Sequence, residues 1–131
     1  MKRTILVIED NEQNLYLTTF LLEQGGFLVV AARSGPEGIE LAARIQPDLI
    51  LLDIQLPQMD GYAVARVLRQ NPVLKDVPIV AVTSYAMVGD RERTLEAGCS
   101  GYMEKPINPD TFKNDIERYL KARPPGGGIE S

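Results

Sequence analysis

Residues that can do chemistry stand where short apolar runs end. Glu9 and Asp10 follow the run TILVI, Asp53 ends the run LILLD, Thr83 ends IVAVT, and Lys105 follows GYME. An acid at the end of a strand is usually a helix cap or a solvated loop residue. Here three acids, a lysine and a hydroxyl follow successive apolar runs, and the carboxyl ends of parallel strands meet at one edge of a sheet. The pattern therefore predicts a single polar site.

Three carboxylates at one site carry a charge of −3 and repel one another unless cations intervene. One Mg²⁺ ion together with Lys105 brings that sum to zero, and Mg²⁺ needs only one or two direct carboxylate ligands. We expect Glu9, with a longer arm than Asp10, to reach the ion through a water. A carboxylate beside such an ion can attack a phosphoryl group. We therefore expect Asp53 to accept a phosphoryl group. Lys105 and the Thr83 hydroxyl would then stabilise the negative charge on the phosphoryl oxygens.

Short apolar runs alternate along the chain with amphipathic stretches. Because the runs lack polar alternation, they predict strands that are buried on both faces. The expected strands are Thr4–Glu9, Leu28–Ala31, Leu49–Asp53, Ile79–Thr83 and Gly101–Glu104. The expected helices are about Asn11–Gln24, Gly35–Ile45, Tyr62–Gln70, Gly89–Ala97 and Pro109–Lys121. This alternation predicts an α/β fold with a parallel sheet and helices on both faces.

Composition limits the function further. The 131 residues suit one domain, and the 14 basic and 18 acidic residues, net charge −4, are spread along the chain. This argues against nucleic acid or a membrane surface as a direct partner. We expect a cytoplasmic protein, since no membrane span or leader pattern is present. Cys99 is the single cysteine, so no intrachain disulfide forms, and the absence of histidine excludes histidine-based catalysis and a phosphohistidine on this chain.

Over Lys2 to Lys121 the chain resembles the receiver domains of two-component response regulators. The motifs that carry the resemblance are Ile8-Glu9-Asp10-Asn11, the stretch Asp48–Pro57, Met59-Asp60-Gly61, Pro78–Thr83 and Lys105-Pro106. The resemblance implies a flavodoxin-like (βα)5 fold, a doubly wound parallel sheet of five strands in the order 2-1-3-4-5. It also implies a receiver domain over residues 1–122 and a flexible tail over 123–131.

The resemblance also assigns roles to residues. Asp53 is the phosphorylation site, Glu9 and Asp10 are the acid pair for Mg²⁺, the backbone carbonyl of Gln55 is a further metal ligand, Lys105 contacts the phosphate, Thr83 is the switch hydroxyl and Tyr102 is the switch aromatic. In the family, movement of the threonine and the aromatic reshapes the face of the fourth helix, fifth strand and fifth helix. Gln55 and Tyr85 occupy positions that tune the rate of dephosphorylation.

The implied partners are a sensor histidine kinase or histidine phosphotransfer protein as donor, and a downstream effector protein. The first helix is the expected docking surface for the donor, with Asn14, Leu17 and Leu21 on its more exposed side. Since no output domain follows the fifth helix, the chain is similar to stand-alone receivers of the chemotaxis-regulator and DivK types. Its output is then a change in partner binding, as a monomer or a phosphorylation-dependent dimer.

Two alternatives stay open. The chain can be a phosphate sink, phosphorelay intermediate or scaffold without an output of its own. It can also be a small Mg²⁺-dependent phosphatase with an aspartate nucleophile. Such phosphatases carry a second aspartate two residues after the nucleophile, where this chain has Gln55, so we expect no turnover of an external metabolite.

Overall fold

The computed structural model describes residues 2–57, 59–84 and 90–122. A parallel sheet of five strands lies at its centre, in the order β2-β1-β3-β4-β5. The strands are β1 (Thr4–Ile8), β2 (Leu28–Ala32), β3 (Leu49–Asp53), β4 (Ile79–Thr83) and β5 (Gly101–Glu104). Both the class of fold and the strand order are as predicted.

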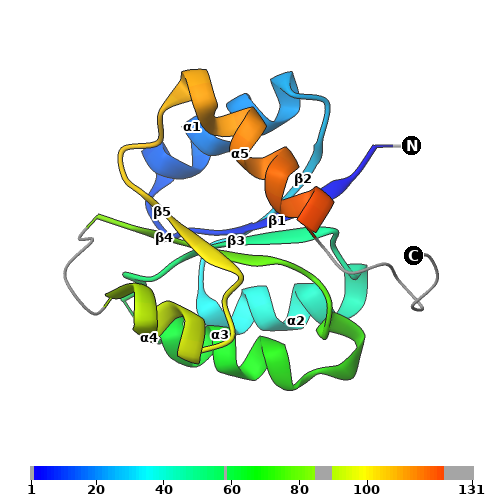
Figure 1. The fold of residues 1–131 in the computed structure, drawn as a ribbon, viewed down its shortest axis with the longest axis vertical. Helices are drawn as coiled ribbons and strands as arrows, with labels where there is room; N and C mark the ends of the chain where they lie inside the picture. Colours follow the sequence, from blue (N-terminus) through cyan, green and yellow to red (C-terminus); the bar gives the residue numbers. More distant parts are fainter. Residues whose placement is uncertain (1, 58, 85–89, 123–131) are drawn as a thin grey trace.

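Helices cover both faces of the sheet. Helices α1 (Glu12–Gln24) and α5 (Pro109–Ala122) lie on one face, above the sheet in Figure 1. Helices α2 (Gly35–Ile45), α3 (Gly61–Gln70) and α4 (Asp90–Glu96) lie on the other. All agree with the predicted ranges to within about two residues, except that Gly89, the expected start of α4, lies outside the described residues.

Alternate side chains of each central strand enter two separate cores. In β1, Leu6 and Ile8 pack on the side of α2 to α4, whereas Ile5 and Val7 pack on the side of α1 and α5. The same alternation runs through β3 and β4, which are buried along their whole length. Apolar contact on both faces explains why the central strands have uninterrupted apolar sequences.

The outer strands are less buried than the sequence predicts. In β2 Leu28 is 49% exposed, and no residue of β5 is fully buried. Both strands lie at edges of the sheet, where only one neighbouring strand covers them. An apolar run therefore signals a strand but does not distinguish a central strand from an edge strand.

Side-chain caps begin three of the helices, α1, α2 and α3. The side chain of Asn11 accepts a hydrogen bond from the Asn14 N–H (2.9 Å) at the start of α1. Ser34 caps α2 by accepting from the Glu37 N–H (3.2 Å), and Asp60 caps α3 by accepting from the Tyr62 N–H (3.0 Å). Each cap satisfies a backbone donor that the helix leaves unpaired, so the switch from strand to helix needs only a few residues.

Arg69, near the end of α3, makes hydrogen bonds to backbone carbonyls of segments outside its own helix. Its guanidinium donates to the carbonyls of Leu74 (2.8 Å) and Val77 (2.8 Å) around the short 3₁₀ helix η1 (Pro72–Leu74), and to that of Gly98 (2.9 Å) after α4. The helix η1 was not predicted from the sequence, because three residues are too few to show a periodic pattern. Its short turn is anchored by Asn71, which accepts from the Val73 N–H (3.0 Å).

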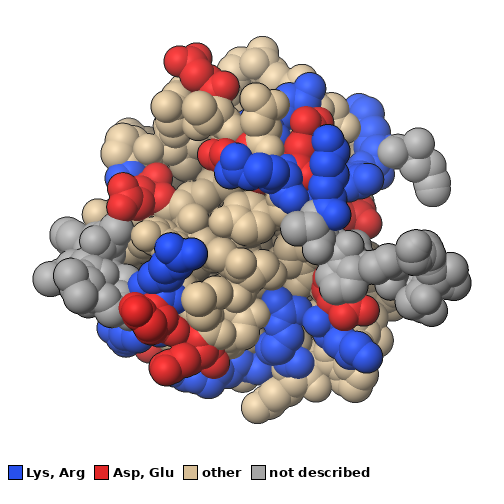
Figure 2. All heavy atoms as spheres, in the orientation of Figure 1, with Lys and Arg blue, Asp and Glu red and all other residues tan. Residues whose placement is uncertain are grey.

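Charge is distributed over the surface without segregation by sign. Figure 2 shows acidic and basic side chains interspersed on the visible face, as expected from their spread along the sequence. Among the described residues, none of the helices has both the length and the apolar character that crossing a membrane requires.

Candidate functional site

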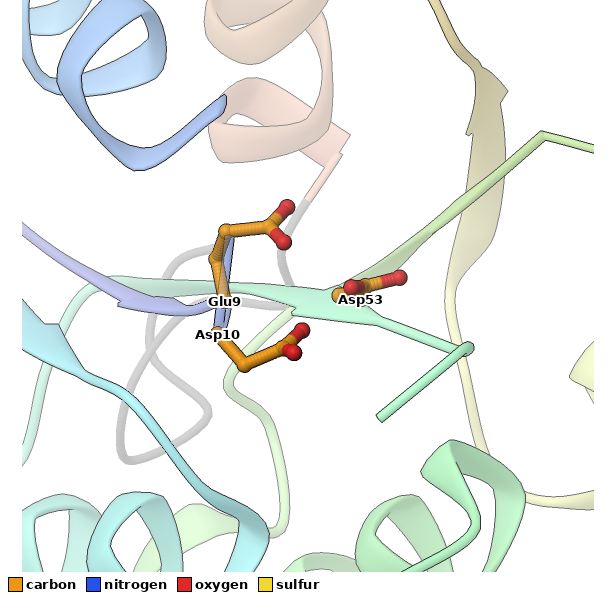
Figure 3. Close-up of side chains that lie close together, drawn as sticks. All are labelled: Glu9, Asp10 and Asp53. Carbon is orange, nitrogen blue, oxygen red and sulfur yellow. The ribbon is translucent and has the colours of Figure 1, made fainter. Parts of the chain in front are cut away.

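Three carboxylates meet at the carboxyl edge of the sheet. Asp53 is the last residue of β3, and Glu9 and Asp10 come directly after the neighbouring β1. Figure 3 shows the Glu9 and Asp10 carboxyl groups above and below the level of Asp53, both directed to the side where Asp53 lies. Oxygen atoms of the three residues lie within 4.8 Å of one another. The structure thus brings together the three acids that the sequence placed at strand ends.

Lys105 supplies positive charge to two of the three acids. Its Nζ lies 3.2 Å from Oδ1 of Asp53 and 3.3 Å from Oε1 of Glu9. The loop after β5 places this lysine, because the Lys105 N–H donates to the carbonyl of Thr83 (2.7 Å), the last residue of β4. The peptide bond between Lys105 and Pro106 is cis. Thr83 itself is buried, one strand away from Asp53.

Backbone N–H groups hold the buried carboxylates in place. The Gln55 N–H donates to Oδ1 of Asp53 (2.9 Å), and the Asn11 N–H donates to Oε2 of Glu9 (3.1 Å). Because Asp53 and Glu9 are only 3% and 5% exposed, these bonds replace contacts that water would otherwise make. Asp10 is exposed, so the site has two buried acids and one that faces solvent.

The surroundings of Glu9 disfavour the charged form of its carboxyl group. Burial, reinforced by the hydrogen bond with Asp53 and by the charge of Asp53, raises the pKa of Glu9 from its usual 4.5 to about 7. The Asn11 N–H and the Lys105 charge oppose that rise without cancelling it. One lysine therefore does not neutralise the cluster, which leaves room for a further cation.

The donor set fits Mg²⁺. All three side chains offer carboxylate oxygens, the hard ligands that Mg²⁺ prefers, and the exposed Asp10 leaves space for the waters that the ion keeps. The buried Glu9 lies close enough to the other two acids to coordinate the ion directly or through a water. The predicted metal contact of the Gln55 carbonyl remains a prediction.

The predicted switch aromatic, Tyr102, lies on the edge strand β5. Tyr102, on β5, pairs in register with Ala81 of β4, and its half-buried side chain packs against the core on the side of α2 to α4. Its predicted switch role stays a prediction. Tyr85 lies outside the described residues.

The predicted docking helix has a more apolar surface than the sequence reading assigned to it. Leu15, Thr18 and Leu22 face the core as expected, and Leu17 is 39% exposed. Beside it, Tyr16 and Phe20 stack with their ring centroids 6.4 Å apart, both exposed. The 3–4 spacing that marks the core-facing stripe does not distinguish these aromatics from other residues of the exposed face.

Sequence reasoning also missed a contact beside Asp53. The Gln55 side-chain carbonyl accepts a hydrogen bond from the Ser84 N–H (3.3 Å), joining the loop after β3 to the loop after β4. No local sequence signal marks this bond, because it connects residues far apart in the chain through a backbone group.

The chain belongs to the response regulator receiver domains, whose family model matches residues 5–117. Within that family it is similar to the polar-differentiation response regulator DivK of Brucella ovis. The two are 42% identical over 120 residues, which is 92% of this chain and 98% of the relative. The chain is thus a receiver domain of two-component signalling that is similar to DivK, as the motifs at its strand ends predicted.

Solved structures agree with this placement. The receiver domain of a sensor histidine kinase from Pseudomonas aeruginosa PAO1 superposes with a TM-score of 0.85 at 33% identity, covering 92% of this chain and 99% of that one. That structure has a magnesium ion coordinated in its active-site cleft. A response regulator structure from Chloroflexus aurantiacus J-10-fl gives a TM-score of 0.87 at 27% identity, covering 92% and 99% of the two chains.

Proposed function

We propose that Asp53 accepts a phosphoryl group from a phosphohistidine on a sensor histidine kinase or histidine phosphotransfer protein, in the cytoplasm and with Mg²⁺. The observation that carries the proposal is the placement of Asp53. It is buried at the end of a central strand, 3.2 Å from Lys105 and beside two further acids. These 131 residues contain no histidine, so the donor histidine lies outside this sequence.

The transfer exchanges one bond to phosphorus for another. A carboxylate oxygen of Asp53 forms a bond to phosphorus as the bond from phosphorus to the histidine nitrogen breaks, and the nitrogen keeps the electron pair. Hydrolysis later replaces the Asp53 oxygen by a water oxygen and releases inorganic phosphate. The protein's part is mainly to position the carboxylate and to stabilise charge on the phosphoryl oxygens.

Residues already at the site supply much of that stabilisation. Lys105 contacts Asp53, and the Gln55 N–H points at the same carboxylate. Glu9, Asp10, Asp53 and the carbonyl of Gln55 would hold Mg²⁺, which when bound offsets negative charge on the acids and on the phosphoryl oxygens. Thr83 completes the set of donors from the next strand.

The output of this module is a change in protein contacts. We propose that Thr83 and Tyr102 carry the change from Asp53 to the face formed by α4, β5 and α5. A groove of about 310 Å³ between β5 and α5, lined by Tyr102, Ile107 and Tyr119 among others, gives an effector protein a place to bind. Figure 2 shows an uncharged band in the middle of this view, where Figure 1 places β5. The module acts as a monomer or as a phosphorylation-dependent dimer.

The test is intact-mass spectrometry after incubation with acetyl phosphate and Mg²⁺. We expect one added phosphoryl group on the wild type and on Asp110→Asn, a change of an exposed aspartate at the start of α5. We expect none on Asp53→Asn, and none on the wild type when a chelator removes Mg²⁺. If acetyl phosphate, phosphoramidate and a phosphorylated kinase all leave the mass unchanged, Asp53 is not a phosphoacceptor.

A further inference from the structure

The solvent-facing side of α1 carries two large aromatic side chains. Tyr16 is 74% exposed and Phe20 is 46% exposed. Their rings stack, with centroids 6.4 Å apart and planes inclined by 15°. Outside α1, the large exposed hydrophobic residues of the described part of the chain each lie on a different element: Leu28, Val67, Val73 and Leu95. Such single residues are normal on a protein surface, whereas a stacked aromatic pair forms a larger apolar patch.

The aromatic pair belongs to a stripe with the spacing of a helix–helix seam. Gln13, Tyr16, Phe20 and Glu23 follow one another at intervals of three, four and three residues, and all four are exposed. These intervals place side chains on one face of a helix. The residues of α1 that face the core are others: Leu15, Thr18 and Leu22. We call the four exposed residues the outer stripe, a second face of α1 that can pack against a helix.

The chemistry of the outer stripe fits a second copy of the same stripe. If two copies of α1 pack antiparallel about a two-fold axis, Tyr16 of each copy meets Phe20 of the other. Each Gln13 then faces the Glu23 of the other copy, so that an amide donor meets each carboxylate. A parallel pairing would instead bring the two Glu23 carboxylates together, and like charges in contact repel. The charge pattern therefore favours the antiparallel pairing.

We propose that the outer stripe of α1 is an interface through which two unphosphorylated copies of the protein associate, with their α1 helices antiparallel. A neighbouring acid does not oppose the contact, because Glu12 is already paired with Arg33 at 3.0 Å. Two aromatic pairs make a small interface of the transient class, which buries less than about 1,200 Å². The association goes beyond the proposed function of Asp53 and does not depend on it.

The experiment follows association of the full chain up to about 1 mM, with a chelator and no phosphoryl donor, by sedimentation equilibrium and amide chemical shifts. Tyr16→Gln and Phe20→Gln each remove a ring and keep a residue that favours a helix. Val73→Gln, which changes a 53% exposed residue on η1, is the matched control. Thermal unfolding of each variant checks that it is folded.

A further variant, Gln13→Lys, tests the orientation of the two helices. In the antiparallel pairing the new lysine faces the Glu23 of the other copy. In the parallel pairing it faces a second lysine. The two orientations therefore predict opposite changes in the dissociation constant.

We expect the wild type to dimerise within this range, with concentration-dependent chemical shifts at the outer stripe. Tyr16→Gln and Phe20→Gln should raise the Kd at least about tenfold, while Val73→Gln leaves it unchanged. Gln13→Lys should lower the Kd about threefold to tenfold, because the two-fold axis forms the exposed ion pair twice.

Three results would overturn the proposal. A wild type that stays monomeric at about 1 mM would assign the outer stripe to a different partner. A Kd that Tyr16→Gln leaves unchanged would place the contact on another face, and a Kd that Gln13→Lys fails to lower would exclude the antiparallel pairing. None of these results bears on phosphorylation of Asp53, which the mass measurement tests separately.

Discussion

At the scale of single residues, Glu9 should couple the protonation of the site to the binding of Mg²⁺. The pKa of Glu9 is raised to about 7 in the metal-free fold, against 4.5 for an ordinary glutamate. The folded state therefore holds this proton over a pH range in which the unfolded chain has lost it. The contribution of Glu9 to stability is greatest below about pH 4.5 and falls as the pH rises towards about 7.

Magnesium should reverse that loss, because a divalent cation favours the charged carboxylate. We predict that saturating Mg²⁺ raises the Tm more at about pH 8 than at about pH 6, and that its affinity grows between these values. Thermal unfolding with Mg²⁺ or with a chelator at each pH measures the effect. Glu9→Gln is the control, and its Mg²⁺ response should depend much less on pH. A Tm increase that is the same at both pH values in the wild type contradicts the prediction.

Asp10 should strengthen Mg²⁺ binding but lower the stability of the metal-free protein. It is exposed and lies within 4.8 Å of the two buried acids, so its charge adds repulsion. We predict that Asp10→Asn raises the Tm of the metal-free protein by about 2 °C, the shift that roughly 0.5 kcal/mol produces in a domain of this size. The same variant should lose most of the stabilisation by Mg²⁺. A lower Tm in the presence of a chelator would show that Asp10 stabilises the metal-free fold.

At the scale of elements, Arg69 connects α3 to η1 and to the turn after α4. Its guanidinium donates to four backbone carbonyls, which a lysine or an apolar side chain cannot do. We predict that Arg69→Met lowers the free energy of unfolding by about 2 kcal/mol, because it leaves carbonyls of partly buried segments unpaired. Urea unfolding measures the change. Arg66→Met, at an exposed position of the same helix, should stay within about 0.5 kcal/mol of the wild type.

The elements that position the site were predictable for a local reason. Runs such as LILLD carry both the strand signal and the functional residue at its end, and caps such as Asn11 and Asp60 mark where the next helix begins. Once the strands are known to be parallel, their ends must meet at one edge. The residues at those ends can then be assigned to one site without knowledge of the tertiary structure.

Contacts made through the backbone were not predictable in the same way. The partners of Arg69 are carbonyl groups, and the partner of the Gln55 side chain is an N–H group, so the identity of the residue on the other side leaves no signal. The edge strands show a similar limit, since the sequence of β2 is as apolar as that of a central strand. The backbone contacts and the exposure of the edge strands both depend on where segments distant in the sequence lie in space.

At the scale of the whole molecule, the reactivity of the Cys99 thiol measures how the native fold opens. It is the only cysteine in the sequence, it is 5% exposed, and burial raises the pKa of its thiol to about 11, although the Arg69 charge opposes the rise. Because the thiolate is the reactive form, the native protein should react very slowly with thiol reagents. Reaction then requires an opening that exposes the thiol.

That opening should be global, because Cys99 is fastened from both sides. Its N–H donates to the Thr94 carbonyl (3.0 Å), and the next N–H, of Ser100, donates to the Ile79 carbonyl (2.7 Å) of a central strand. We predict that Mg²⁺ at about 100 times its Kd slows labelling of Cys99 about 100-fold, the factor by which it shifts the unfolding equilibrium. The labelling rate is measured with and without Mg²⁺, under conditions in which the protein recloses faster than the reagent reacts. The ratio of the two rates is then compared with the change in unfolding free energy that urea unfolding of the same samples gives. If Mg²⁺ stabilises the protein to urea but leaves the labelling rate unchanged, Cys99 is exposed by a local opening around α4 that keeps the metal site intact.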